Sequence, residues 1–471
     1  MVVTAGDWRF DASRIPLPLD DWCALHAPRQ LDALRNAVDA LFGGAIVNHS
    51  ENRPALHMAL RAADPGTLCD AGDADLVRTG RDRLLDAAGR LHAGDSGIRT
   101  LLHAGIGGSD LGPRLVADAL DGPDSAVDVE WLTTLDARRL KRLLERLDPA
   151  ETGLVVASKS FSTVETLTQA RAIRDWLGPA AGDRIWAATA DRRRACAFGV
   201  ADDHVLEFPD WVGGRFSLWS GVGLSAAAVV GRERWRALLR GAETVDRAVA
   251  ADPAGTPALA LALSIDVLVR RTGFGTLGVV AYDPRLRLLA EYLQQLVMES
   301  LGKRVQPDGS PVEQGTSPLI FGGAGTDLQH SLFQALHQGT TRHPMLLVGT
   351  AGNVPGYEDW QREQLAHLLG QASALVNGTY ADDPQRVLPG NNPVLLMLAR
   401  RLSPESLGAL LATFEHAVYL LGVLWRINPF DQWGVEEGKR LAGAFREALQ
   451  GGEDGPDATL TATLEWLRRE A

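Results

Sequence analysis

The chain has 471 residues, of which 45% are hydrophobic and 23% are charged, so it is long enough for two or three globular domains with large cores. Its formal net charge of -12 argues against a nucleic-acid binder and against docking on acidic membranes. Three widely spaced cysteines, Cys23, Cys69 and Cys196, argue against a zinc or disulfide framework and favour a reducing cytoplasm. We expect no secretory signal and no membrane span, because the longest apolar run, 258–269, is too short.

The first hundred residues are predicted to be mostly helical and show no site chemistry. Helical spacing of apolar residues indicates helices over 31–42 and 81–92. The segment 51–61, ENRPALHMALR, also resembles a helix from Pro54 onward. Its histidine, His57, is interpreted as a packed side chain rather than a ligand.

A strand, a glycine turn and a helix follow from about Ile98. The strand is predicted over 100–104, and the turn contains Gly105, Gly107, Gly108 and Ser109. Glycines allow a tight turn and a close approach of the backbone to a ligand, and the next helix N-terminus favours anions. A dinucleotide-binding turn is an open alternative, with Asp136 after the next strand, 127–132, as the ribose acid. Such a turn needs glycine where Asp110 stands, and a turn without any ligand also fits.

The next unit is a buried strand, a hydroxyl-rich loop and a helix. The strand is predicted over 154–157, and the polar residues of the loop are Ser158, Lys159, Ser160, Ser162 and Thr163. Hydroxyls, free backbone N–H groups and a lysine together can hold a phosphate. Helix capping, with Glu165 completing a capping box, explains one hydroxyl but does not require five polar residues. The spacing is not that of a nucleotide triphosphate loop, so we predict a phosphate monoester site.

Further strands are predicted over 184–189 and 205–208, before a glycine turn that carries Arg215. An arginine held there can reach an oxyanion, although a surface ion pair is the alternative. A second α/β unit begins near Thr276 with a strand over 277–282, after a helix over 259–271.

The stretch 292–304, YLQQLVMESLGKR, is predicted to be an amphipathic helix of this second unit. Gly302 and Lys303 are interpreted as its end, a glycine cap with a cation in the last turn. Glu299 lies near that end, where the negative end of the helix dipole makes a carboxylate a better base. Gln295 is four residues earlier, on the same face. A lone solvated glutamate is the alternative interpretation.

The chain then becomes glycine-rich and helical again from about Leu328. His330 and His337 are seven residues apart, so we expect them on one helix face, with acid/base chemistry or packing as their roles. Metal binding would require a third ligand, which the spacing does not provide. We expect a strand over 345–349.

The last part of the chain is predicted to be helical, and it includes helices at 359–377 and 404–425. A later helix carries Lys439 close to its N-terminus, where a surface lysine is the simpler interpretation. Alternating strands and helices in two blocks predict two doubly wound α/β domains.

Six motifs, in order along the chain, resemble the glucose-6-phosphate isomerase (phosphoglucose isomerase) family. They are GIGGSDLGP, ASKSFSTVET, GGRFSLWSGVGL, YLQQLVMESLGK, QHSLFQALHQGT and NPFDQWGVEEGK, and ENRPALHMALR is a weaker seventh. The resemblance implies two sugar-isomerase (SIS) α/β/α domains, a helical C-terminal arm, a homodimer with an active site shared between subunits, and no cofactor or metal. The expected parts are an N-terminal helical segment on the large domain (1–65), a smaller SIS domain (66–230), a larger SIS domain (231–425) and a C-terminal helical segment (426–471).

The resemblance also implies roles for individual residues. Glu299 is similar to the base that moves a proton between C2 and C1 of the sugar. His330, from the partner subunit, and Lys439 resemble the groups that open the sugar ring, and Arg215 resembles the group that stabilises the enediolate. The expected phosphate and substrate contacts are Ser158, Lys159, Ser160, Thr163, Gly108, Ser109, Gln295 and Gln432.

The chain departs from the family at three places near these residues. Leu301 replaces a common asparagine, Asp327 and Leu328 replace an Asn-Gly pair, and the segment SPLIFGGAG is unusual. Three alternatives stay open: a non-catalytic SIS-domain sensor, a nicotinamide-dependent dehydrogenase, and a relaxed isomerase that also accepts mannose 6-phosphate.

Overall fold

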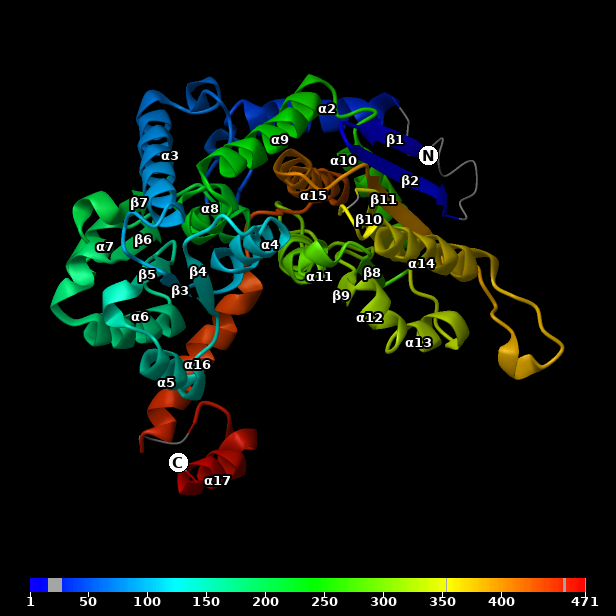
Figure 1. The fold of residues 1–471 in the computed structure, drawn as a ribbon. Helices are drawn as coiled ribbons and strands as arrows, with labels where there is room; N and C mark the ends of the chain where they lie inside the picture. The colour runs from blue at the N-terminus through cyan, green and yellow to red at the C-terminus, as the bar shows by residue number, and fades with distance from the viewer. Residues whose placement is uncertain (16–27, 353, 452–454, 471) are drawn as a thin grey trace. The chain divides into compact units, whose positions relative to one another are not determined.

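The structure is a computed structural model, and it describes residues 1–15, 28–352, 354–451 and 455–470 (Figure 1). Contacts divide the chain into two compact units, Met1–Pro429 and Phe430–Ala471. Cys23 lies outside the described residues, and the other two cysteines are free thiols.

The first unit contains a five-stranded, fully parallel sheet with the strand order β4-β3-β5-β6-β7. This smaller sheet confirms the five strands predicted between residues 100 and 208. Its strands are β3 (Thr100–Ala104), β4 (Asp128–Leu132), β5 (Thr152–Ala157), β6 (Ile185–Thr189) and β7 (Val205–Glu207).

Helices follow four of these strands and cover the smaller sheet. They are α4 (Leu111–Ala119), α5 (Ala137–Arg146), α6 (Val164–Leu177) and α7 (Arg192–Phe198). Leu154 and Val156 of β5 are fully buried in a core with Ile173 of α6. Strands that are buried on both faces favour uninterrupted apolar runs, which is why β5 was recognisable in the sequence.

The first unit also contains a six-stranded sheet with the order β1-β2-β11-β10-β8-β9. β8, β9, β10 and β11 are parallel to one another, whereas β2 is antiparallel to β11 and β1 is antiparallel to β2. The strands are β1 (Val2–Ala5), β2 (Trp8–Arg14), β8 (Thr276–Ala281), β9 (Leu319–Ala324), β10 (Met345–Thr350) and β11 (Val394–Ala399). The predicted second α/β block is therefore confirmed.

The expectation of a helical N-terminal segment over 1–65 is wrong for residues 2–14, which contain the strands β1 and β2. Trp8, Phe10 and Ala12 are buried at alternate positions of β2, so this strand packs on the core while it pairs with β11. Figure 1 shows β1 and β2 at that edge of the larger sheet. The two helices expected in this region are confirmed as parts of α2 (Pro28–Phe42) and α3 (Ala71–His92).

One described helix, α15 (Pro404–Trp425), is long and apolar enough to cross a membrane, but 83% of its apolar window is buried inside the protein. It packs against α9 (Arg232–Ala251) and α10 (Pro257–Asp266). Such burial on all sides is typical of a core helix.

The second unit contains α16 (Glu436–Leu449) and α17 (Thr461–Glu470). Arg468 of α17 donates a hydrogen bond to the carbonyl of Ala448, at 2.9 Å. The predicted boundaries at residues 65, 230 and 425 remain a prediction, although each parallel set of strands comes from one of the two proposed SIS ranges.

Candidate functional site

The site begins where the strand order of the smaller sheet reverses. β3 is the first strand of this sheet and β5 the third, and they are parallel neighbours. Their carboxyl ends therefore lead into adjacent loops, 105–110 and 158–163, at one edge of the sheet. Doubly wound sheets bind ligands in the crevice at this switch point.

The glycine turn after β3 makes a close backbone contact with the 3-10 helix Gly214–Trp219, the Arg215 segment. A Cβ on Gly108 would lie 2.0 Å from the Gly214 carbonyl oxygen and 2.7 Å from the Arg215 nitrogen. Gly107 has a φ of 60° and faces Gln295, whose Nε2 would lie 2.8 Å from a Cβ at this position. These glycines allow the turn to approach two expected substrate contacts.

The buried His103 ring fixes the end of this turn. Its Nε2 lies 2.7 Å from the Ser109 carbonyl oxygen and its Nδ1 lies 2.8 Å from Ser225 Oγ. Because a carbonyl only accepts hydrogen bonds, Nε2 carries the proton. Burial lowers the pKa of His103 to about 4, so the ring is neutral at pH 7. Ser109 is therefore held by a fixed donor.

Two acids that bear on the dinucleotide alternative have structural partners. The Asp136 side chain accepts a hydrogen bond from the Arg139 backbone and caps α5. Asp110 is buried beside Arg114, with 3.2 Å between its carboxylate and Nε. Burial raises the pKa of Asp110 to about 6. Asp136 is thus occupied as a helix cap, which weakens its interpretation as a ribose acid.

The hydroxyl-rich loop after β5 leaves the N-terminus of α6 without a side-chain cap. Thr163 occupies the cap position but accepts no capping hydrogen bond. Instead its hydroxyl lies 3.1 Å from Ser158 Oγ, and Ser160 Oγ lies 2.6 Å from Ser162 Oγ. The capping interpretation is therefore wrong for Thr163. The hydroxyls of the loop lie at the N-terminus of α6, where free backbone N–H groups favour an anion.

The backbone of this loop is anchored to the neighbouring strand β6. Thr189 Oγ1 donates to the Lys159 carbonyl at 2.9 Å, and the Ala190 nitrogen donates to the same oxygen at 2.9 Å. Phe208 donates its N–H to the Thr189 carbonyl at 3.1 Å. Phe161 is buried and has a φ of 45°, an uncommon conformation for a bulky side chain.

A second cation near the loop was not predicted from the sequence. Burial, followed by the charge of Arg53, lowers the pKa of Lys159. Arg53 Nη1 donates to the Asp210 carbonyl at 2.9 Å. Arg53 belongs to the ENRPALHMALR motif, which was the only signal for it. Two neighbouring cations favour a dianionic phosphate group.

The guanidinium of Arg215 is clamped by three acceptors. It donates from Nε to Ser300 Oγ at 2.6 Å, from Nη1 to Glu299 Oε1 at 2.9 Å, and from Nη2 to the Pro429 carbonyl at 2.5 Å. Its side chain is 1% exposed, whereas that of Glu299 is 24% exposed. The surface ion-pair alternative is therefore wrong, because Arg215 is a buried, fully oriented cation facing a partly open carboxylate.

Glu299 receives hydrogen bonds on both carboxylate oxygens, because Gln295 Nε2 donates to Oε2 at 2.9 Å. The predicted shared face of these two residues is confirmed. The helix is α11 (Leu289–Leu293), and it continues as a π-helical stretch over Gln294–Glu299. Such wider turns are frequent at functional sites.

The helix ends after Leu301, as predicted, but not through a left-handed glycine cap. Gly302 is absent from the described glycines with positive φ, and a Cβ there would lie 2.6 Å from the Met298 carbonyl oxygen. Lys303 Nζ donates to the carbonyls of Glu299 and Ser300 at 2.7 and 3.0 Å. Leu301, one of the departures from the family, is fully buried.

The two histidines expected on one helix face lie on separate elements. His330 is exposed at the end of α12 (Gly325–Gln329), whereas His337 lies in α13 (Phe333–Gln338). The break at 330–332 overturns the expectation of one continuous helix. His337 Nε2 lies 2.7 Å from Gln371 Oε1, which identifies His337 as a packed side chain.

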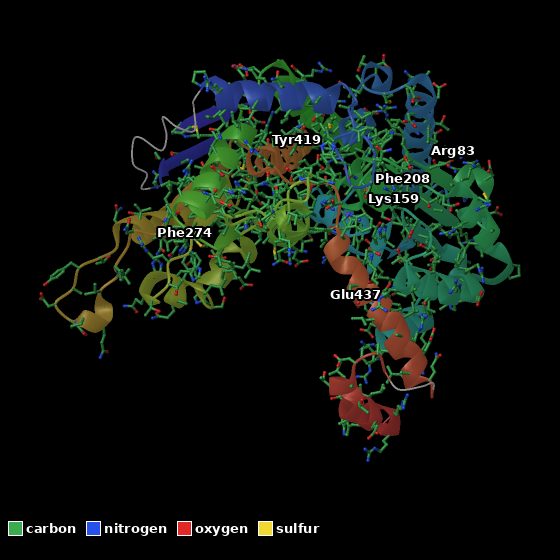
Figure 2. The ribbon with its side chains drawn as sticks, turned by 180° about the vertical axis from the view of Figure 1, so that it is seen from behind. Arg83, Lys159, Phe208, Phe274, Tyr419 and Glu437 are labelled. Carbon is green, nitrogen blue, oxygen red and sulfur yellow. The ribbon has the colours of Figure 1, made fainter. Side chains whose placement is uncertain are left out.

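Gln432 and Lys439 belong to the second unit. Lys439 lies in α16, the helix marked by Glu437 in Figure 2, and its Nζ lies 2.7 Å from Glu436 Oε1. Both side chains of this pair are more than half exposed. Exposed pairs at this spacing contribute little to stability, so the cation is not sequestered by its partner.

The contacts described above bring together Gly108, Arg215, Gln295 and Glu299 from segments that are distant in sequence. Ser158, Lys159, Ser160 and Thr163 form a loop on the neighbouring strand. Ser300 and the Pro429 carbonyl were missed. The sequence contains no pattern that links them to Arg215.

Comparisons with known proteins identify the family of the chain. A family model described as phosphoglucose isomerase matches residues 20–461. A glucose-6-phosphate isomerase of Stenotrophomonas maltophilia (strain R551-3) is 47% identical over 91% of this chain and 84% of its own length. One from Xylella fastidiosa (strain 9a5c) is 43% identical over 91% and 85%.

Solved structures show the same similarity. A glucose-6-phosphate isomerase from Chlamydia trachomatis D/UW-3/Cx superposes with a TM-score of 0.88 at 27% identity, covering 100% of this chain and 93% of that one. A hypothetical protein from Thermus thermophilus gives 0.72 at 25% identity, covering 93% and 99%. The family model and these relatives show that the chain belongs to the phosphoglucose isomerase family.

Proposed function

We propose that the protein interconverts D-glucose 6-phosphate and D-fructose 6-phosphate through ring opening and a cis-enediolate intermediate. The observation that carries this proposal is the Glu299 carboxylate, which is partly open to solvent and is oriented on one oxygen by Arg215 and on the other by Gln295. A fixed carboxylate beside a buried cation suits proton abstraction next to a carbonyl group.

The phosphate group of the substrate would bind at the loop of Ser158, Lys159, Ser160 and Thr163. This end of the sugar does not react, so its binding energy serves to position the reacting carbons. The uncapped N-terminus of α6 and the two neighbouring cations, Lys159 and Arg53, support this assignment. Gly108, Ser109 and Gln432 are further proposed substrate contacts.

Glu299 would remove the proton from C2 and return it to C1, while a second proton passes from the C2 hydroxyl to the C1 oxygen. When the carboxylate takes this proton it becomes neutral, and the negative charge moves to the enediolate oxygen. Arg215 is already desolvated and oriented by Ser300 and Pro429, so it stabilises the charge in either position without reorganisation. The reverse reaction takes the proton from C1 by the same steps.

Ring opening is assigned to His330 and Lys439. His330 is exposed on the first unit, which fits our proposal that it acts in the active site of a second copy in a homodimer. Lys439 lies on the second unit with an exposed amine. We also propose that the protein acts in the cytoplasm, in glycolysis and gluconeogenesis.

A coupled assay tests the activity directly: fructose 6-phosphate is supplied, glucose 6-phosphate is detected, and EDTA is present throughout. Wild-type turnover with a loss of about 10²–10⁴-fold in Glu299→Gln is expected, because this is the usual contribution of a general base. Glu291→Gln is the matched control, since Glu291 is an exposed carboxylate of the same helix that pairs with Arg114 at 2.8 Å.

Turnover that Glu299→Gln retains would remove Glu299 from the mechanism. No turnover in a confirmed dimer would favour the sugar-phosphate sensor, whereas turnover that depends on added NAD would favour the dehydrogenase.

A further inference from the structure

A buried cluster of charged side chains lies behind the Arg215 segment and takes no part in the proposed chemistry. Arg61 donates from Nε and Nη2 to the two oxygens of Asp246, at 2.7 and 2.6 Å, and from Nη1 to Glu415. His416 Nε2 lies 2.7 Å from Asp246 Oδ1. All four side chains are at most 6% exposed, so the cluster is dry.

The cluster joins parts of the chain that are distant in sequence. Asp246 lies on α9, Glu415 on α15, and Arg61 directly after the 3-10 turn His57–Leu60. Desolvating three charges is costly, and apolar side chains of similar volume often give equal or greater stability. Stability alone therefore does not explain why these buried side chains are charged. Their directional hydrogen bonds do more than apolar packing would, because they fix the positions of the elements that carry them.

One end of the Arg215 segment is bound to this cluster. Trp219 Nε1 donates to Glu415 Oε1 at 2.9 Å, and Trp219 is 3% exposed. The guanidinium of Arg61 lies over the same indole ring, 4.6 Å from its centroid. The residues Gly214–Trp219 form a 3-10 helix, so fixing Trp219 restricts the rotation and translation of Arg215.

The other end of the segment contacts the same cluster through His57. The His57 and Phe216 rings are 4.6 Å apart, and Phe216 is adjacent to Arg215. His57 Nε2 also lies 3.9 Å from Glu415 Oε2. Burial, followed by the charge of Arg61, holds the pKa of His57 well below its usual value, so the ring packs as a neutral group.

We propose that Glu415 is a positioning residue which, through Trp219, fixes the Arg215 segment and thereby the guanidinium that faces Glu299. The cluster is thus the rigid support of the enediolate-stabilising cation, and this role rests on the proposed function. Glu415 itself is fully buried and acts only through its neighbours.

The test is Trp219→Phe, which removes the indole N–H and keeps an aromatic ring for Arg61. We expect kcat to fall about tenfold while KM for fructose 6-phosphate stays within about twofold, because displacement of a catalytic group by a fraction of an ångström impairs the transition state more than substrate binding. Circular dichroism and thermal unfolding confirm that the variant is folded.

Tyr419→Phe is the matched control. Tyr419 lies one turn after Glu415 on α15, where Figure 2 labels it, and its hydroxyl donates to the Ala37 carbonyl at 2.7 Å. This variant also removes one donor from the surroundings of α15, but the donor lies outside the cluster. A similar loss of thermal stability with unchanged kcat is expected.

A double-mutant cycle with Arg215→Ala shows whether Trp219 acts through Arg215. In the Arg215→Ala background, Trp219→Phe should lower kcat no further, because the group that it positions is already absent. An equal tenfold loss in both backgrounds would overturn the proposal. Glu415→Gln supplies a second route to the same cycle if Trp219→Phe does not fold.

The outcomes also separate this inference from the proposed function. Wild-type protein without turnover overturns both. If the wild type turns over and Trp219→Phe has the same kcat as Tyr419→Phe, the positioning role is overturned and the proposed function stands.

Discussion

The parallel strands of the two sheets of the first unit share a strand order, but the sheets differ at the point where that order reverses. Among the parallel strands of the larger sheet, the order is β9-β8-β10-β11, in which β8 is the first in sequence and β10 the third. The smaller sheet has the same arrangement around β3 and β5. The topology therefore provides two equivalent crevices, one in each sheet.

The crevice of the larger sheet is closed by the protein's own side chains. Asp283, two residues after β8, is 2% exposed and accepts a hydrogen bond from Thr350 of β10 at 2.5 Å. Arg285 Nη2 lies 2.7 Å from the same carboxylate. A buried carboxylate that is already paired repels a phosphate and offers it no free donor.

The two loops of the smaller sheet's crevice, 105–110 and 158–163, present hydroxyls, glycines and a lysine, and their one carboxylate, Asp110, is buried beside Arg114. Strand order thus creates the place for a ligand, whereas the residues just after the strands decide whether one binds. The proposed base, Glu299, lies in the second α/β block, at the end of the π-helical stretch Gln294–Glu299.

The largest effect within this comparison of the two crevices is expected from Gly108→Ala at the open switch point. The new Cβ would lie 2.0 Å from the Gly214 carbonyl oxygen, so the backbone before Arg215 must shift. We expect kcat to fall about 100-fold, the loss that a misplacement of about 1 Å produces. Gly182→Ala, where no atom lies within 4 Å of the new Cβ, is the control. Equal kcat values in the two variants would show that the contact between Gly108 and Gly214 does not affect catalysis.

Lys159→Ala should give the next largest effect. Loss of a charged hydrogen bond to the phosphate costs about 1.5–3 kcal/mol, so KM is expected to rise about 10- to 100-fold. Steady-state kinetics on fructose 6-phosphate measures this, with Lys141→Ala, an exposed lysine of α5, as the control. An unchanged KM would place the phosphate elsewhere.

Asp283→Asn, at the closed switch point, should leave kcat and KM unchanged. We expect only a loss of stability of about 1–3 kcal/mol, because a buried charged hydrogen-bond partner of Thr350 and Arg285 is weakened. Denaturant unfolding measures this loss. A rise in KM as large as that of Lys159→Ala would mean that the two crevices are not different in function.

The sequence predicted most of the strands that are buried on both faces, because apolar runs such as 154–157 have few other interpretations, but it missed β11 (VLLMLA), whose residues are also almost all buried. It did not predict β9, whose residues LIFGGA include two glycines with φ of 148° and 153°. A Cβ on Gly322 would lie 1.8 Å from the Val279 carbonyl oxygen, so glycine is required by the neighbouring strand. Such a requirement is tertiary and leaves no local pattern.

The site residues show the same difference between contacts within one helix or loop, which the sequence predicts, and contacts between distant segments, which it does not. The pairing of Gln295 with Glu299 follows from helical spacing, and the hydroxyl loop follows from composition. The contacts of Arg215 with Glu299 and Ser300 span 84 and 85 residues, and no periodicity reports them. The family resemblance supplied the role of Arg215, but only the structure shows that Ser300 and Pro429 orient it.

A calorimetric titration of fructose 6-phosphate into Glu299→Gln separates substrate binding from proton transfer. We expect this variant to bind the sugar phosphate with a Kd near the wild-type KM while it fails to turn it over, because our proposal places the phosphate at the open switch point and assigns the proton transfer to Glu299. Loss of binding in step with loss of activity would contradict this mechanism and would identify Glu299 as a structural residue.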